Sequence, residues 1–242
     1  MNNASRQARI DLAAAYRLAV MHDFHEGICN HFTLVPPDRD DCFLIIAHGT
    51  HWAEVTASNL LLVDHDGGVL EGDGRPEASA LCIHGTIHRA HPDARCVLHT
   101  HMPYATALAM IDGGRLEPAH QTAIRFLDRV AYDDAFSGLA LDAGEGERIT
   151  AALGDKTVLF LANHGVIVVG PTVAQAYDAL YYLERACQLQ VLAMSTGRPL
   201  KHVPSEIAER TAGEYVNKAP FSEIHFAALK RVLDRTHSDY AA

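Results

Sequence analysis

The sequence predicts an α/β fold built as a single domain. Short apolar runs bounded by turn residues, typical of buried strands, alternate with longer stretches of helical periodicity. A chain of 242 residues with 48% hydrophobic and 21% charged side chains also suits one globular α/β domain. No repeat, low-complexity linker or composition shift divides it. We therefore expect one domain over residues 1–242, with a core over residues 5–200 and a helical extension over residues 201–242.

The expected elements follow along the chain. Residues 6–24 carry apolar side chains at steps of three and four, which predicts a helix with one apolar face. Apolar runs at 42–46, 60–63, 96–98, 158–161 and 166–169 predict strands of a largely buried sheet. Helices are expected at 79–90, 103–111, 146–153 and 173–194, the last of them after the typical N-cap residue Thr172. Two shorter helices are expected at 205–211 and 221–233.

The charge balance argues against two classes of partner. Twenty basic and thirty acidic residues give a net charge of −10, which repels nucleic acids and anionic membrane surfaces. The N-terminus carries no secretory signal, and the apolar stretch 180–194 is too short and too charged to cross a bilayer. Five widely spaced cysteines without a C-x-x-C pair indicate reduced thiols. We therefore expect a cytoplasmic protein without nucleic-acid or membrane partners.

Histidine is the unusual residue of the composition, with 16 copies. His99 and His101 end the apolar run 96–98, and side chains two residues apart on a strand project to the same side. His164 ends another predicted strand, beside a glycine that lets the backbone turn sharply. Three such imidazoles suit a transition metal with open coordination positions. Scattered surface or core histidines stay open as the alternative, because H-x-H arises easily by chance in this chain.

Several segments match, in order and spacing, the landmarks of one known family. They are His99-Thr100-His101 after residues 92–98, Asn163-His164-Gly165 before residues 166–170, the helix 176–193, and the segments 29–33 and 56–60. Through them the chain resembles the class II aldolase/adducin family. The resemblance implies a three-layer α/β/α sandwich around a mostly antiparallel central sheet, and a homotetramer with active sites at subunit boundaries. It also implies that His99, His101 and His164 bind one divalent metal ion per subunit, with zinc expected ahead of manganese or iron.

One position departs from the family pattern. Aldolases of the family carry a catalytic glutamate nineteen residues before the first histidine of the H-x-H pair, and here that residue is Ala80. Alanine cannot transfer a proton, so the family's aldol mechanism cannot operate unchanged. His84, one helical turn beyond Ala80, is our candidate catalytic group, either as a replacement base or as a residue that reaches the metal. A hydrogen-bonded structural histidine beneath the site is the alternative.

The phosphate-binding positions of the family are altered as well. They correspond here to Cys29-Asn30, His48-Gly49 and Ala78-Ser79, of which Asn30, Gly49 and Ser79 retain the family residue. A phosphate dianion needs several donors, so a sugar phosphate is a poor substrate and a carboxylate or an aromatic ring fits better. We expect Asn30, His48, Gly49 and Ser79 to contact the substrate. His31, His48 and His51 are either orienting donors or ordinary loop histidines.

His120 is the second catalytic candidate. It lies in a segment that, in relatives of the resembled family, is close to a subunit boundary and supplies a donor to an active site. A role in substrate binding or proton transfer stays open beside that of a helix cap or surface residue.

These residues favour a metal-dependent carbon–carbon lyase, either aldolase-like or a decarboxylase, acting on a small non-phosphorylated carbonyl or hydroxy-carboxylate compound. Decarboxylation needs no base to begin, because carbon dioxide itself leaves, and it is therefore compatible with Ala80. A non-haem Fe(II) oxygenase on the same scaffold is one alternative. A non-catalytic, adducin-like interaction module is another, against which the three retained histidines argue.

Overall fold

The computed structural model describes residues 3–139, 143–216 and 219–242. Its centre is an eight-stranded sheet in the order β4-β3-β2-β1-β5-β8-β7-β6. Neighbouring strands are antiparallel except β6 and β7, which are parallel. The strands are β1 (His31–Leu34), β2 (Cys42–Ile45), β3 (Leu61–Asp64), β4 (Val69–Glu71), β5 (Cys96–Thr100), β6 (Val130–Asp133), β7 (Val158–Leu161) and β8 (Gly165–Gly170).

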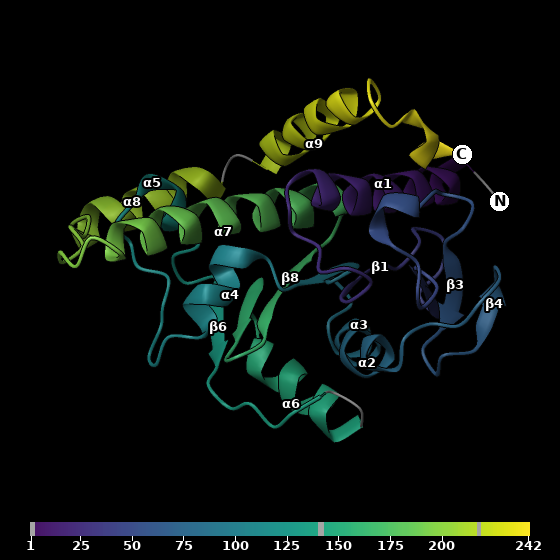
Figure 1. Ribbon diagram of the computed structural model, residues 1–242, viewed down its shortest axis with the longest axis horizontal. Helices are drawn as coiled ribbons and strands as arrows, with labels where there is room; N and C mark the ends of the chain where they lie inside the picture. The colour runs from purple at the N-terminus through teal and green to yellow at the C-terminus, as the bar shows by residue number, and fades with distance from the viewer. Residues whose placement is uncertain (1–2, 140–142, 217–218) are drawn as a thin grey trace.

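Helices cover both faces of this sheet (Figure 1). On one face lie α1 (Asn3–Met21), α4 (Pro103–Ala109) and α7 (Val173–Met194), with α9 (Ala219–Leu233) packed on α1 and α7. On the other lie α2 (Ala78–Ala80), a π-helical turn η2 (Leu81–Gly85), α3 (Thr86–Ala90) and α6 (Ala143–Leu153). Two short 3-10 turns, η1 (Trp52–Glu54) and η3 (Ser238–Ala241), pack against α1, and α5 (Gln121–Ile124) packs against α8 (Ser205–Val216). This arrangement confirms the predicted α/β sandwich with a mostly antiparallel sheet.

The two largest of three apolar clusters lie on opposite faces of the sheet. The larger lies under α1 and α7, where Leu12, Leu98 and Tyr177 are completely buried. The smaller lies under α3 and α6 and includes Ile87, Ile149 and Ile167. Adjacent residues of β5 and β8 serve opposite cores because strand side chains alternate between faces. Burial on both sides explains why these strands read as continuous apolar runs.

Three strands were not predicted from the sequence. β1 carries His31 and Thr33 among apolar residues, β4 is exposed on the edge of the sheet, and β6 is only partly buried for most of its length. β2, β3 and β7 are just as short, so it is the mixed or incompletely buried side chains that hide these three strands from the sequence pattern. The helix expected at 79–90 is also interrupted by η2, and α8 extends beyond the predicted residue 211 to Val216.

A close approach fixes the interrupted helix against α6. A Cβ atom on Gly146 would lie 2.1 Å from the carbonyl oxygen of Cys82, so only glycine lets α6 cross the π-helical turn at this distance. The hydroxyl of Thr150 donates to that of Thr86 one turn later, at 3.1 Å. These contacts fix the segment that carries His84.

No helix within the described ranges is long and apolar enough to span a membrane.

Candidate metal centre

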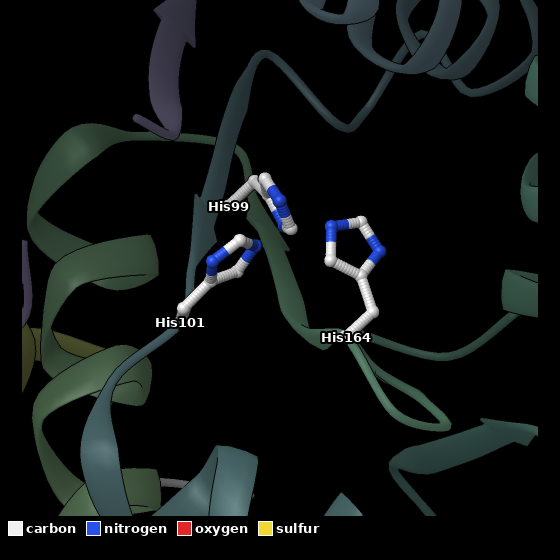
Figure 2. Close-up of side chains that lie close together, drawn as sticks. All are labelled: His99, His101 and His164. Atoms are coloured by element: carbon white, nitrogen blue, oxygen red, sulfur yellow. The ribbon is translucent and has the colours of Figure 1, made fainter. Parts of the chain in front are cut away.

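Three histidines from two neighbouring parts of the sheet converge (Figure 2). His99 lies in β5, His101 follows its last residue, and His164 lies in the turn between β7 and β8. The centroid of the His164 ring is 4.8 Å from those of both His99 and His101, which are 5.1 Å apart. One nitrogen of each ring lies within 4.8 Å of the others. The predicted ligand set therefore comes together as a candidate metal centre.

Hydrogen bonds orient two of these rings. His99 Nδ1 donates to the carbonyl oxygen of Val166 at 3.0 Å, and His101 Nδ1 donates to a carboxylate oxygen of Glu26 at 2.6 Å. Each Nε2 is therefore left with a free lone pair, since a neutral imidazole carries only one proton. His101 Nε2 is buried and has no hydrogen-bond partner. An orphaned buried acceptor aimed at two other imidazoles fits a metal ion, and the carboxylate behind it is a typical outer partner of a metal-binding histidine.

The same surroundings keep the rings of His99 and His164 neutral. Burial, and to a smaller extent the neighbouring His101, lower the pKa of His164 to about 4. Burial also holds the pKa of His99 well below its usual value. Neutral imidazoles are the form that binds a metal without first losing a proton. The donor set therefore fits a divalent transition metal near neutral pH.

Gly165 allows the rings to approach. A Cβ atom at this position would lie 2.5 Å from the carbonyl oxygen of Thr100 and 2.7 Å from Cδ2 of the His101 ring. Asn163, two residues earlier, has a φ of 58°, the left-handed conformation that asparagine tolerates better than most residues. The Asn163-His164-Gly165 sequence thus forms the tight turn that places His164 beside β5.

Two of the four predicted substrate-binding residues lie at this centre. Asn30 is buried, and its side-chain oxygen accepts a hydrogen bond from the backbone N–H of His101 at 3.2 Å. Ser79 Oγ lies 3.3 Å from Nε2 of His31, whose ring centroid is 5.3 Å from that of His99. His48 and Gly49 lie instead on an exposed turn after β2, where the His48 N–H donates to the carbonyl of Arg75. None of the hydrogen bonds described for this turn reaches the three histidines.

The structure leaves His84 no free ring nitrogen. Its side chain is completely buried, Nε2 bonds to His31 Nδ1 at 2.8 Å, and Nδ1 bonds to the Thr33 hydroxyl at 2.7 Å. In this arrangement His84 does not itself reach a metal or a substrate, so any part it plays passes through His31. Ala80, the position of the family glutamate, is completely buried in an apolar cluster with Phe43 and Val63.

His120 occupies the N-cap of α5. Its Nδ1 accepts a hydrogen bond from the backbone N–H of Thr122 at 3.2 Å, and the side chain is exposed. Within one chain this is the capping role that had stayed open as the alternative to catalysis.

Comparison with known proteins decides the family. The sequence matches the family described as the class II aldolase and adducin N-terminal domain over residues 10–191. The chain belongs to the class II aldolase and adducin family. An aldolase II superfamily protein from Pseudomonas syringae is 38% identical and superimposes with a TM-score of 0.94, covering 100% of this chain and 98% of that one. The resemblance noted in the sequence is therefore confirmed, and with it the fold.

Two further family members are informative. A Caulobacter vibrioides protein whose name provisionally assigns it to the class 2 aldolases is 35% identical, covering 100% of this chain and 94% of that protein. A Streptomyces niveus protein named decarboxylase NovR is 30% identical over 211 residues, covering 85% of this chain and 77% of that protein. The family thus includes a relative named as a decarboxylase.

Sequence reasoning missed two residues that complete the site. Glu26 reaches His101 from the loop after α1, 75 residues away along the chain, and no local pattern marks it. Thr33 bonds both His84 and His88. Its signal was present, because His31 and Thr33 are two residues apart and share a face once β1 is recognised as a strand.

Proposed function

We propose that this protein is a metal-dependent carbon–carbon lyase of the decarboxylase type. Its substrate is a small, non-phosphorylated carbonyl or hydroxy-carboxylate compound, bound at His99, His101 and His164. The observation that carries the proposal is the orphaned Nε2 of His101, buried and aimed at two other neutral imidazoles. The relative named as a decarboxylase supports the reaction class. Zinc is the metal we expect, one ion per subunit, ahead of manganese or iron.

The surroundings of Ala80 favour decarboxylation over aldol cleavage. Ala80 is packed among apolar side chains and has no group that could move a proton at the position of the family glutamate. Decarboxylation breaks the bond between the carboxylate and its neighbouring carbon, C2, and carbon dioxide leaves. In a substrate with a carbonyl group on C3, the electron pair forms a C2–C3 double bond and the negative charge moves to the oxygen on C3. A proton is then added to C2. A bound metal would supply Lewis-acid stabilisation of the substrate oxygen that takes up this negative charge.

Other residues of the chain would hold the metal-binding histidines in place and contact the substrate. Glu26 fixes the tautomer and ring orientation of His101, and the carbonyl of Val166 does the same for His99. The side-chain oxygen of Asn30 holds the backbone N–H of His101. The substrate-binding positions on this chain are then Asn30 and Ser79. We keep His48, Gly49 and His120 as proposed contacts in two cases only. One is a larger substrate that reaches them, and the other is an assembly of subunits that brings them to an active site.

We also propose a cytoplasmic homo-oligomer, with a tetramer as the expected state. The five cysteines are all free thiols, which suits a reducing compartment. Large apolar side chains are exposed on α7 and α9, among them Leu192 at 51% and Ile224 at 64%. Such side chains are often covered by another subunit. Light scattering of the eluted protein would measure the mass of the assembly directly.

Elemental analysis followed by an anaerobic assay tests the activity. Purified protein should contain about one transition metal per chain, and the zinc-loaded protein should release carbon dioxide from a member of a keto-acid and hydroxy-acid panel without oxygen. His99→Ala should lose both metal and activity, whereas His237→Ala, at an exposed histidine, should retain both. Absence of stoichiometric metal, or carbon dioxide release that His99→Ala leaves unchanged, contradicts the proposal. Activity that requires Fe(II) and oxygen would favour the oxygenase instead.

A further inference from the structure

A continuous chain of buried hydrogen bonds runs behind the three-histidine cluster. It begins at the carbonyl oxygen of Ala94, which lies 2.9 Å from His88 Nδ1. His88 Nε2 is 2.8 Å from the Thr33 hydroxyl, which is 2.7 Å from His84 Nδ1. His84 Nε2 is in turn 2.8 Å from His31 Nδ1. All four side chains are buried, so water does not interrupt the chain.

The carbonyl at its end fixes the direction of every bond. A carbonyl oxygen only accepts, so the proton of the neutral His88 ring must be on Nδ1 and its Nε2 must accept from the Thr33 hydroxyl. That hydroxyl has a single proton and therefore accepts from His84 Nδ1–H. His84 Nε2 then accepts from His31 Nδ1–H, which leaves the lone pair of His31 on Nε2.

The burial of all three rings, whose described hydrogen bonds include no carboxylate, supports the neutral state on which this reasoning depends. Burial lowers the pKa of His88 to about 3, and it holds the pKa of His84 well below its usual value. The reversed direction would require a proton on His88 Nε2. His88 would then either be charged or face the Ala94 carbonyl with a bare Nδ1, which would leave two buried acceptors facing each other without a proton between them.

The end of the chain lies beside the candidate metal centre. His31 pairs with His99 across β1 and β5, and their ring centroids are 5.3 Å apart. Its Nε2 faces the half-buried hydroxyl of Ser79 at 3.3 Å, a long bond that a ligand hydroxyl can share or replace. The sequence suggested His31 as an orienting donor. The hydrogen-bond chain instead presents it as an acceptor.

We propose that His31 is a specificity-determining residue whose Nε2, held as an acceptor by the chain through His84, Thr33 and His88, selects substrates that carry a hydroxyl group next to the carboxylate. Ser79 and His31 together form this subsite. The inference rests on the proposed function only in placing such a substrate at the three-histidine cluster. His84, Thr33 and His88 are positioning residues, since they act through His31 and touch no substrate.

The tautomers can be measured without any substrate. Nitrogen-15 NMR of the zinc-loaded protein should show His31, His84 and His88 as neutral rings protonated on Nδ1. A proton on Nε2 of His31 would overturn the inference. This measurement uses the unaltered protein and therefore does not depend on whether a variant folds.

Binding of two matched probes tests the specificity. Lactate and 2-methoxypropionate differ only in whether the oxygen on C2 carries a hydrogen or a methyl group. Calorimetry on the zinc-loaded protein gives the ratio of their dissociation constants. Thr33→Val, which breaks the chain at a buried position away from the ligand, should reduce the preference for lactate about fivefold, the worth of one neutral hydrogen bond.

Tyr177→Phe is the matched control. It also removes a single buried, hydrogen-bonded hydroxyl, but Tyr177 lies in α7, bonds His22 and is outside the chain. The ratio of the dissociation constants of lactate and 2-methoxypropionate should equal that of the unaltered protein, because the chain to His31 is intact in the control. The intrinsic preference of the metal is the same in all three proteins. An unchanged ratio in Thr33→Val would overturn the inference and leave the proposed function standing. Failure of both probes to bind a zinc-loaded protein would overturn the two together.

Discussion

Acid should destabilise this protein through His88, by an amount that the structure sets. His88 is buried between the Thr33 hydroxyl and the Ala94 carbonyl, and burial lowers its pKa from 6.5 to about 3. Below pH 6.5 the unfolded chain binds a proton at this residue that the folded chain does not bind until the pH nears 3. The stability contributed by the neutral ring is therefore complete above pH 6.5 and is lost as the pH falls. At pH 5 the linkage relation gives a loss of about 2 kcal/mol.

Urea unfolding at pH 7.5 and pH 5.0, with a chelator present to remove any metal contribution, measures this loss. His88→Gln should be less stable than the unaltered protein at pH 7.5, since glutamine cannot make both hydrogen bonds. Between the two pH values, however, the free energy of unfolding of His88→Gln should fall by about 2 kcal/mol less. His237→Gln, at an exposed histidine, should keep the full pH dependence. Equal losses in His88→Gln and the unaltered protein would refute the reasoning.

Two predictions concern the metal ligands. Gly165→Ala should weaken zinc binding at least fivefold in a chelator competition, because the added Cβ would lie 2.7 Å from Cδ2 of His101. Gly85→Ala, whose added Cβ has its nearest contact at 3.6 Å, should leave zinc binding unchanged. Equal zinc affinities of the two variants would contradict the steric argument. Glu26→Gln should weaken zinc binding about 10- to 100-fold with little change in the free energy of unfolding, and Glu209→Gln, on an exposed helical position, serves as its control. Unchanged affinity in Glu26→Gln would show that the carboxylate does not support the ligand.

Most of the fold could be predicted from the sequence, because strands that are buried on both faces of the sheet form apolar runs that are easy to recognise. The helix Val173–Met194 and the strand Val158–Leu161 begin and end at the predicted residues. β1 could not be predicted in the same way, since its four residues mix His31 and Thr33 with apolar side chains. The π-helical turn has no sequence signature of its own, and it follows from packing against α6.

The residues of the candidate site also differ in whether the sequence could predict them. His99 and His101 could be predicted from strand alternation, which is a local rule, and His164 from the tight turn at Gly165. Glu26 could not, because it reaches His101 only after α1 packs on the sheet. His84 lay on the expected helix, but its two hydrogen bonds depend on β1, so its chemical surroundings followed from tertiary structure alone.

The placement of the three ligands has a consequence for local opening of the sheet. His99 lies in the central strand β5 and His101 directly follows it, whereas His164 belongs to the hairpin of β7 and β8. Any fluctuation that separates the hairpin from β5 also separates the ligands, so an ion bound there would act as a cross-link between the two. Its binding free energy would add to the cost of that opening. Amide hydrogens of β5, β7 and β8 would then exchange with solvent more slowly in the metal-loaded protein, while those of the edge strand β4 would not.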